Sequence, residues 1–170
     1  GTSGTKFPRG TDSLPVNNLD DAVSIMTSRG IDKIKLSGTL VVLPGDVLDG
    51  YIIEGVNQQD AVVFMAPGST CVSTIFRDTV LTGTATGYFL AERCWVTDIS
   101  NVGSDTQGTV FNTCQFLTVN NPCITFKSGL TTPESILIFE SYSGAIEDTD
   151  LVFDMNGTEA DIQFLGWKGP

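Results

Sequence analysis

Histidine is absent from this chain of 170 residues. Without an imidazole, neither a Ser-His-Asp nor a Cys-His catalytic arrangement can be built. Four cysteines are present, Cys71, Cys94, Cys114 and Cys123, but no two of them form a CxxC pair. Zinc sites of the Cys/His type are built from such pairs and from histidines. We therefore expect neither a metal ion nor another cofactor.

Positive charge is scarce. Nine lysines and arginines stand against twenty aspartates and glutamates, which gives a formal net charge of −11. A polyanion such as DNA would be repelled by this excess, and anionic membranes are disfavoured for the same reason. No apolar run approaches the roughly 18 residues that a membrane span requires. We expect no nucleic-acid partner and no membrane insertion, and we interpret the acidity as a means of keeping the protein soluble.

Apolar residues are abundant, at 41% of the chain, and a strand-sized phrase recurs in its second half. The three copies are residues 75–80, 90–95 and 110–115, which read IFRDTV, LAERCW and VFNTCQ. They start 15 and 20 residues apart. Self-similarity at about 20 residues is typical of a solenoid, in which each repeat is one coil and stacking buries the core. The long outer faces of such a fold, rather than a buried pocket, would then decide the function.

One amphipathic helix is predicted between Asn17 or Asn18, as N-cap, and Gly30, as the C-terminal stop. Its apolar face holds Leu19, Ala22, Val23 and Met26, at the spacing of a helix. We expect this helix to cover the open end of the solenoid core. We accordingly divide the chain into a lead with a capping helix, residues 1–30, and a β-solenoid domain, residues 31–170. Residues 1–5 contain no apolar run, so we expect no secretory signal. Because the chain lacks an initial Met and ends at Trp167-Lys168-Gly169-Pro170, we expect it to be a piece of a longer polypeptide.

Beyond Gly30 the pattern changes to short apolar segments separated by turns, which indicates an all-β fold. Hairpin signals are sparse, and Asn156-Gly157 is the clearest of them, so coils are favoured over a meander. The predicted fold is a parallel β-helix, or β-solenoid, capped at its N-terminal end by one α-helix. The expected strands outside the three repeats lie at 31–36, 37–43, 51–55, 61–65, 136–139, 151–155 and 162–165.

Cys94 and Cys114 fall at the same position of consecutive repeats. This predicts stacked thiols inside the solenoid, where a free cysteine behaves as a small hydrophobic residue. A disulfide is the alternative, since stacked coils lie about 4.8 Å apart and the pair would need suitable Cβ geometry. We favour reduced thiols and assembly in a reducing cytoplasm.

Several short motifs stand out along the chain: Phe7-Pro8-x-Gly10-Thr11, Pro15-Val16-Asn17-Asn18-Leu19-x-Asp21-Ala22, Gly30-Ile31, Glu140-Ser141-Tyr142-Ser143-Gly144 and Phe153-Asp154-Met155-Asn156-Gly157. Together they resemble a recurring segment of bacteriophage tail-fibre and tail-associated virion proteins. The resemblance covers most of the chain. It implies a helix-capped, right-handed β-helix-like section of a tail fibre, spike or decoration protein, commonly a homotrimer, which contacts other virion proteins. It also implies assembly in the host bacterial cytoplasm, location in the virion, and no catalytic residues.

The densest acidic stretch contains Glu147, Asp148 and Asp150 and is followed by Asp154. We interpret it as a solvated turn. A calcium loop is a second reading, although the spacing of an EF-hand is missing, and a catalytic carboxylate pair is a third. A different acidic pair, Asp78 and Glu92, has arginine neighbours at 77 and 93, which predicts an exposed ladder of ion pairs rather than catalysis.

Three aromatic residues are candidates for ligand or interface contacts, namely Trp95, Tyr142 and Trp167. Strand alternation points Trp95 outward if Cys94 points inward. An outward tryptophan can stack on a sugar, but in a trimeric rod we favour its burial between subunits. The ten phenylalanines are expected to form stacks in the core.

Two classes of function follow. The first is a non-enzymatic structural or host-surface-binding element of a phage particle, which holds its receptor by avidity. The alternative is a carbohydrate-active β-helix, a polysaccharide lyase or hydrolase, that acts on host cell-surface polysaccharide. The sparse charge and the missing histidine favour the first.

Overall fold

The computed structural model describes residues 10–11, 15–104, 107–117, 122–130, 136–143, 152–157 and 161–168. Within these residues the chain forms one helix followed by strands. The elements are α1 (Leu19–Arg29), β1 (Lys33–Leu36), β2 (Gly38–Val42), β3 (Ile52–Gly55), β4 (Ala61–Met65), β5 (Thr70–Arg77), β6 (Val80–Thr84), β7 (Thr86–Glu92), β8 (Trp95–Val102), β9 (Val110–Asn112), β10 (Gln115–Phe116), β11 (Ile124–Phe126), β12 (Ile136–Phe139), β13 (Tyr142–Ser143), β14 (Phe153–Asp154) and β15 (Ile162–Leu165).

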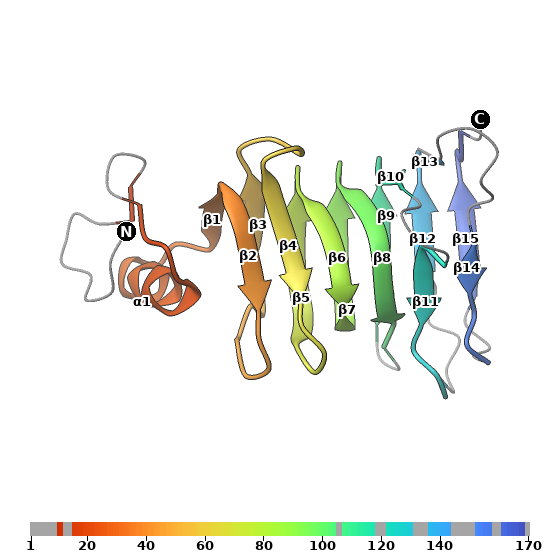
Figure 1. The fold of residues 1–170 in the computed structure, drawn as a ribbon, viewed down its shortest axis with the longest axis horizontal. Coiled ribbons are helices and arrows are strands. Elements are labelled where there is room, and N and C mark those ends of the chain that lie inside the picture. The colour runs from red at the N-terminus through yellow and green to blue at the C-terminus, as the bar shows by residue number, and fades with distance from the viewer. Residues whose placement is uncertain are drawn as a thin grey trace.

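The strands alternate between two sheets as the chain winds along the long axis of the molecule (Figure 1). Sheet 1 has the order β1-β3-β5-β7-β9-β12-β15. Sheet 2 has the order β2-β4-β6-β8-β10-β13. In addition, β11 pairs with β8, and β14 pairs with β11. Every pairing between these strands is parallel. The predicted β-solenoid architecture is therefore confirmed.

The repeat read from the sequence is the repeat of the coils. Ile75 of β5 pairs with Leu90 of β7, and Leu90 pairs with Val110 of β9, so the copies stack in the predicted alignment. The phrase is not one strand, however. In its first copy β5 ends at Arg77 and β6 begins at Val80, so each copy contains a corner between the two sheets.

Helix α1 lies at the N-terminal end of the stack (Figure 1). The Asn18 side chain accepts a hydrogen bond from the Asp21 backbone N–H at 2.8 Å, and Gly30 ends the helix in a left-handed conformation with φ of 63°. These are the cap and the stop that the sequence predicts. Met26 is buried, and Leu19 packs against the solenoid core. Two apolar residues of the helix are thus withdrawn from water at this end of the molecule.

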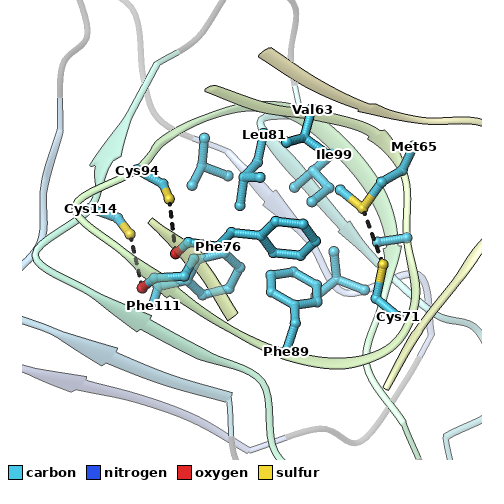
Figure 2. Packing of buried hydrophobic residues seen from close by; sticks show 14 of the residues in the cluster. Val63, Met65, Cys71, Phe76, Leu81, Phe89, Cys94, Ile99, Phe111 and Cys114 are labelled. Atoms are coloured by element: carbon cyan, nitrogen blue, oxygen red, sulfur yellow. Dashed lines mark hydrogen bonds between the residues drawn. The ribbon is translucent and has the colours of Figure 1, made fainter. Parts of the chain in front are cut away.

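A chain of phenylalanines runs through the core. Its members are in edge-to-face contact with ring centroids 5.4–5.7 Å apart, a geometry that aromatic pairs prefer, and they come from β5, β7, β9, β10 and β14: Phe76, Phe89, Phe111, Phe116 and Phe153. Figure 2 shows the rings of Phe76 and Phe89 inside a coil, opposite Leu81 and Val63. The predicted aromatic stacks are confirmed for these residues, and they fill the space that would otherwise be a channel.

The coils differ in length. Strand β8 pairs with β10 through Trp95 and Val96, and with β11 through Ile99 and Val102, so one strand is followed by two in the next coil. Strand β11 was not expected from the sequence. Asn156-Gly157, the clearest hairpin signal, follows the parallel strand β14, and both residues have positive φ.

Candidate functional site

The corner that joins sheet 1 to sheet 2 has the same backbone conformation in four successive coils. Its first residue lies in the left-handed region with φ of 50° at Asp78, 52° at Arg93, 56° at Thr113 and 43° at Glu140. Residues other than glycine rarely adopt this conformation, because the Cβ atom approaches the backbone. Gly166 takes the corresponding place after β15, with φ of 73°.

The next residue of each corner turns inward and is fully buried. Thr79, Cys94, Cys114 and Ser141 form this column, and each has no exposed surface. The Thr79 hydroxyl lies 3.5 Å from the Cys94 sulfur, and the Ser141 hydroxyl accepts a hydrogen bond from the Cys114 backbone N–H at 3.0 Å. A small side chain with a hydrogen-bonding group therefore fits the inner side of the corner.

The thiols of this column are packed against main-chain carbonyl groups. The Cys94 thiol donates to the carbonyl of Phe76, and the Cys114 thiol to that of Ala91, both at 3.4 Å (Figure 2). All four cysteines of the chain are buried and free, as the stacked-thiol prediction requires. Burial raises the pKa of Cys114, and it raises the pKa of Cys71 to about 12. Cys71 and Cys114 therefore stay protonated at neutral pH in the folded protein.

Ion pairs link adjacent coils at the corners of Asp78 and Arg93, and the predicted ion-pair ladder is confirmed there. Arg77 binds Glu92 across sheet 1, and Arg93 binds Asp78 with 2.7 Å between Nη2 and Oδ2. Nearer the N-terminal end, Lys33 binds Glu54, and this hydrogen bond holds the pKa of Glu54 below its usual value. Each carboxylate is engaged by a cation of the adjacent coil.

Of the acidic stretch, Glu147, Asp148 and Asp150 lie outside the described residues. Asp154 is exposed in β14, where its Oδ1 accepts a hydrogen bond from the Asn156 backbone N–H at 2.9 Å. Over the part of the chain that the structure describes, no three His, Cys, Asp or Glu side chains lie close enough together to hold a metal ion.

The three candidate aromatic residues lie at different places. Trp95 is partly exposed on the outer side of β8, as alternation predicts, because its neighbour Val96 is buried. Trp167 packs against the core, with its ring 5.7 Å from that of Phe116 and 5.5 Å from that of Phe164. Tyr142 pairs with Gln115, which pairs with Trp95, so Tyr142 lies two coils beyond Trp95 in sheet 2. The side chain of Tyr142 lies outside the described residues. Trp95, on the outer side of β8, and Trp167, against the core, do not lie on one surface.

Outward apolar residues of sheet 2 lead up to Trp95 from the N-terminal side. The outward positions of β2, β4, β6 and the start of β8 form two adjoining rows on sheet 2, and we call this surface the outer face of sheet 2. Phe64 is 40% exposed on it and Val41 45% exposed, and their strands place them side by side. The face consists of Thr39, Val62, Val80 and Trp95 in one row, and Val41, Phe64 and Thr82 in the other.

This surface was missed from the sequence except for Trp95. Phe64 in particular was expected in the core with the other phenylalanines. The alternation along β4 carried the signal, since Ala61, Val63 and Met65 are buried and Phe64 between them must point away from the core.

Comparisons of the chain with protein-family models, with curated proteins and with solved structures gave no match. Within the described residues, no helix has the length and apolar character to cross a membrane. A functional assignment therefore starts from the fold, the corners and the outer faces of this chain.

Proposed function

We propose that this chain is a non-enzymatic structural and host-surface-binding element of a phage particle, part of a tail fibre, spike or decoration protein. The observation that supports this best is the parallel stacking of β1 to β15 around a filled core. The inter-strand hydrogen bonds of such a stack run along its axis, so that the body is stiff in that direction. The resemblance of the sequence to tail-fibre segments supports the same assignment.

The pairing of the carboxylates favours this function over the carbohydrate-active alternative. Glycoside hydrolysis needs two carboxyl groups that face the substrate, one of them able to give up a proton. The pairs Asp78–Arg93 and Glu92–Arg77 hold their carboxylates in ion pairs along the side of the solenoid. In both pairs an arginine side chain engages the carboxylate that would have to face a sugar.

The proposed assembly contains three copies of the chain together with other virion proteins. Several identical binding surfaces on one particle hold a cell-surface polysaccharide by avidity, even where each contact is weak. Assembly would take place in the cytoplasm of the host bacterium, where thiols such as those of Cys94 and Cys114 stay reduced.

Two measurements on purified protein test the assignment. Bacterial surface polysaccharides are immobilised, and retention of the protein is measured together with the release of new reducing ends or unsaturated products. We expect retention without cleavage. Cleavage would overturn the proposal in favour of a lyase or hydrolase. In parallel, an antiserum against the chain should label particles released from bacteria that carry the gene, and unlabelled particles would contradict a place in the virion.

A further inference from the structure

We infer that residues 56–60, which join β3 to β4, form a strap that fastens three successive coils of the solenoid together. The strap is a conformational device, because it makes these coils near the N-terminal end open as one unit instead of one after another. One side chain, Gln58, and the corner that it reaches carry this device, which does not depend on whether the chain belongs to a phage particle.

The corner between β3 and β4 is longer than the corners that follow it. Five residues separate Gly55, the last residue of β3, from Ala61, the first residue of β4. Two residues separate β5 from β6, and two separate β7 from β8. The longer segment forms an arch at one side of the stack (Figure 1). A loop of this length can extend beyond its own coil.

The loop is held in shape by hydrogen bonds of its own. The Asn57 side-chain oxygen accepts hydrogen bonds from the backbone N–H groups of Gln59 and Asp60, both at 2.9 Å. The Asn57 side-chain nitrogen donates to the Asp60 carboxylate at 2.6 Å. Gln58 is partly buried, whereas Asn57, Gln59 and Asp60 are exposed. An asparagine that closes a turn in this way fixes the direction of the residue between.

Gln58 reaches a coil that is not its neighbour. Its Nε2 donates a hydrogen bond to the backbone carbonyl oxygen of Arg93, in the corner after β7. Strand β3 pairs with β5, and β5 pairs with β7, so the contact spans two coils, about 10 Å along the axis. The corner between them is included, because the Arg93 side chain binds Asp78. The corners at Gly55 and Asp78 also touch, since a Cβ added to Gly55 would lie 2.1 Å from the Asp78 carbonyl oxygen.

The consequence concerns how the stack opens. In a solenoid each coil contacts its neighbours, so an end can fray one coil at a time. A hydrogen bond between two coils that are not neighbours couples their opening. Strands β3 and β4 cannot leave the stack here without breaking the bond to the coil of β7. The three coils that contain β3 to β8 therefore form one cooperative unit.

The test is a set of matched substitutions. Gln58→Ala removes the side chain of the strap, and Gln58→Glu keeps its shape but replaces the donor with a carboxylate that only accepts at neutral pH. Gln59→Ala is the control, since it changes the same residue type at the next position of the same loop, where the side chain is exposed. Far-UV circular dichroism confirms that each variant is folded.

The readout is native-state hydrogen exchange at pH 7, followed by mass spectrometry of peptides from each strand. In the wild type we expect β3 and β4 to exchange together with β5 to β8. In Gln58→Ala and Gln58→Glu the amides of β3 and β4 should exchange about fivefold faster than in the wild type, with those of β7 and β8 unchanged, and Gln59→Ala should match the wild type.

Two results would overturn the strap. One is a wild type in which the coils exchange one after another from the N-terminal end. The other is exchange of β3 and β4 that stays at the wild-type rate in both Gln58 variants. Faster exchange confined to residues 56–60 belongs to this second result, because it would show that Gln58 anchors its own loop and couples no coils.

Discussion

Arg93 holds Asp78 with two hydrogen bonds, from Nε at 2.9 Å and from Nη2 at 2.7 Å. The two residues occupy the same corner of successive coils, and both have a left-handed backbone. The planar guanidinium thus spans the distance between neighbouring coils and binds both carboxylate oxygens at once. It reinforces the stack at a point where the strands themselves are interrupted.

Breaking this pair should cost little, because the Arg93 side chain is 52% exposed and the Asp78 side chain 30% exposed. We expect Arg93→Ala and Asp78→Ala each to destabilise the fold, with a coupling energy of about 0.5–1 kcal/mol in a double-mutant cycle. Urea unfolding of the two single variants and the double variant measures it. The coupling should shrink at about 1 M salt, and a coupling of several kcal/mol would contradict a mostly solvated pair.

Thr113 is the corner residue with the largest expected strain, because it is β-branched and has φ of 56°. Thr113→Gly should raise the free energy of unfolding by about 0.5–1 kcal/mol, since glycine adopts this conformation without a steric penalty. Thr125→Gly, in strand β11, is the matched control and should lower it by about the same amount. Thermal unfolding of both variants decides the matter, and a destabilised Thr113→Gly protein would refute the assignment of strain.

Gly87 leaves no room for a side chain, since an added Cβ would lie 2.2 Å from the carbonyl oxygen of Cys71. Gly45 also has positive φ, but an added Cβ would meet nothing within 4 Å. We expect Gly87→Ala to destabilise the protein by about 3 kcal/mol or more, whereas Gly45→Ala should cost about 1–2 kcal/mol. If urea unfolding showed equal losses of stability for the two variants, the close approach of adjacent coils at Gly87 would not account for the cost of a side chain there.

The buried thiols predict how stability changes at alkaline pH. The pKa of Cys71 is raised to about 12 by burial, so above pH 9 the folded chain retains a proton that the unfolded chain has lost. Its contribution is complete below the unfolded pKa and falls as pH rises, by about 1.4 kcal/mol per pH unit. Between pH 9 and 11, Cys71→Ala should therefore lose stability less steeply than the wild type. If the free energy of unfolding fell equally steeply with pH in both proteins, the Cys71 thiol would not contribute to the pH dependence of stability.

The fold could be predicted because the residues that repeat in the sequence are the ones that pack in the core. Copies of one apolar phrase at 75–80, 90–95 and 110–115 have to stack in register to bury their inward side chains, and the structure has that register. The capping signals of α1 were equally local, at Asn18 and Gly30. Each of these features depends on neighbours in sequence or on one repeated spacing.

The corners and the outer face were harder to predict. Left-handed positions at Asp78, Arg93, Thr113 and Glu140 are imposed by the stack rather than preferred by the residues, so composition gives no sign of them. The division of the β8 pairing between β10 and β11 follows from the length of one coil, which no local pattern encodes. Phe64 was assigned to the core by residue type, although alternation along β4 places it outside.

The register also separates the length of the coils from the height of the molecule. From Ile75 to Leu90 a coil takes 15 residues, and from Val110 to Leu137 it takes 27, yet each adds one strand to sheet 1. The length of the molecule along its axis therefore depends on the number of coils and not on the number of residues in each coil. A family of such chains can lengthen, shorten or exchange the segments between strands without changing where the far end of the rod stands. Mutation can therefore vary the outline of individual coils while the length of the stack along its axis stays constant.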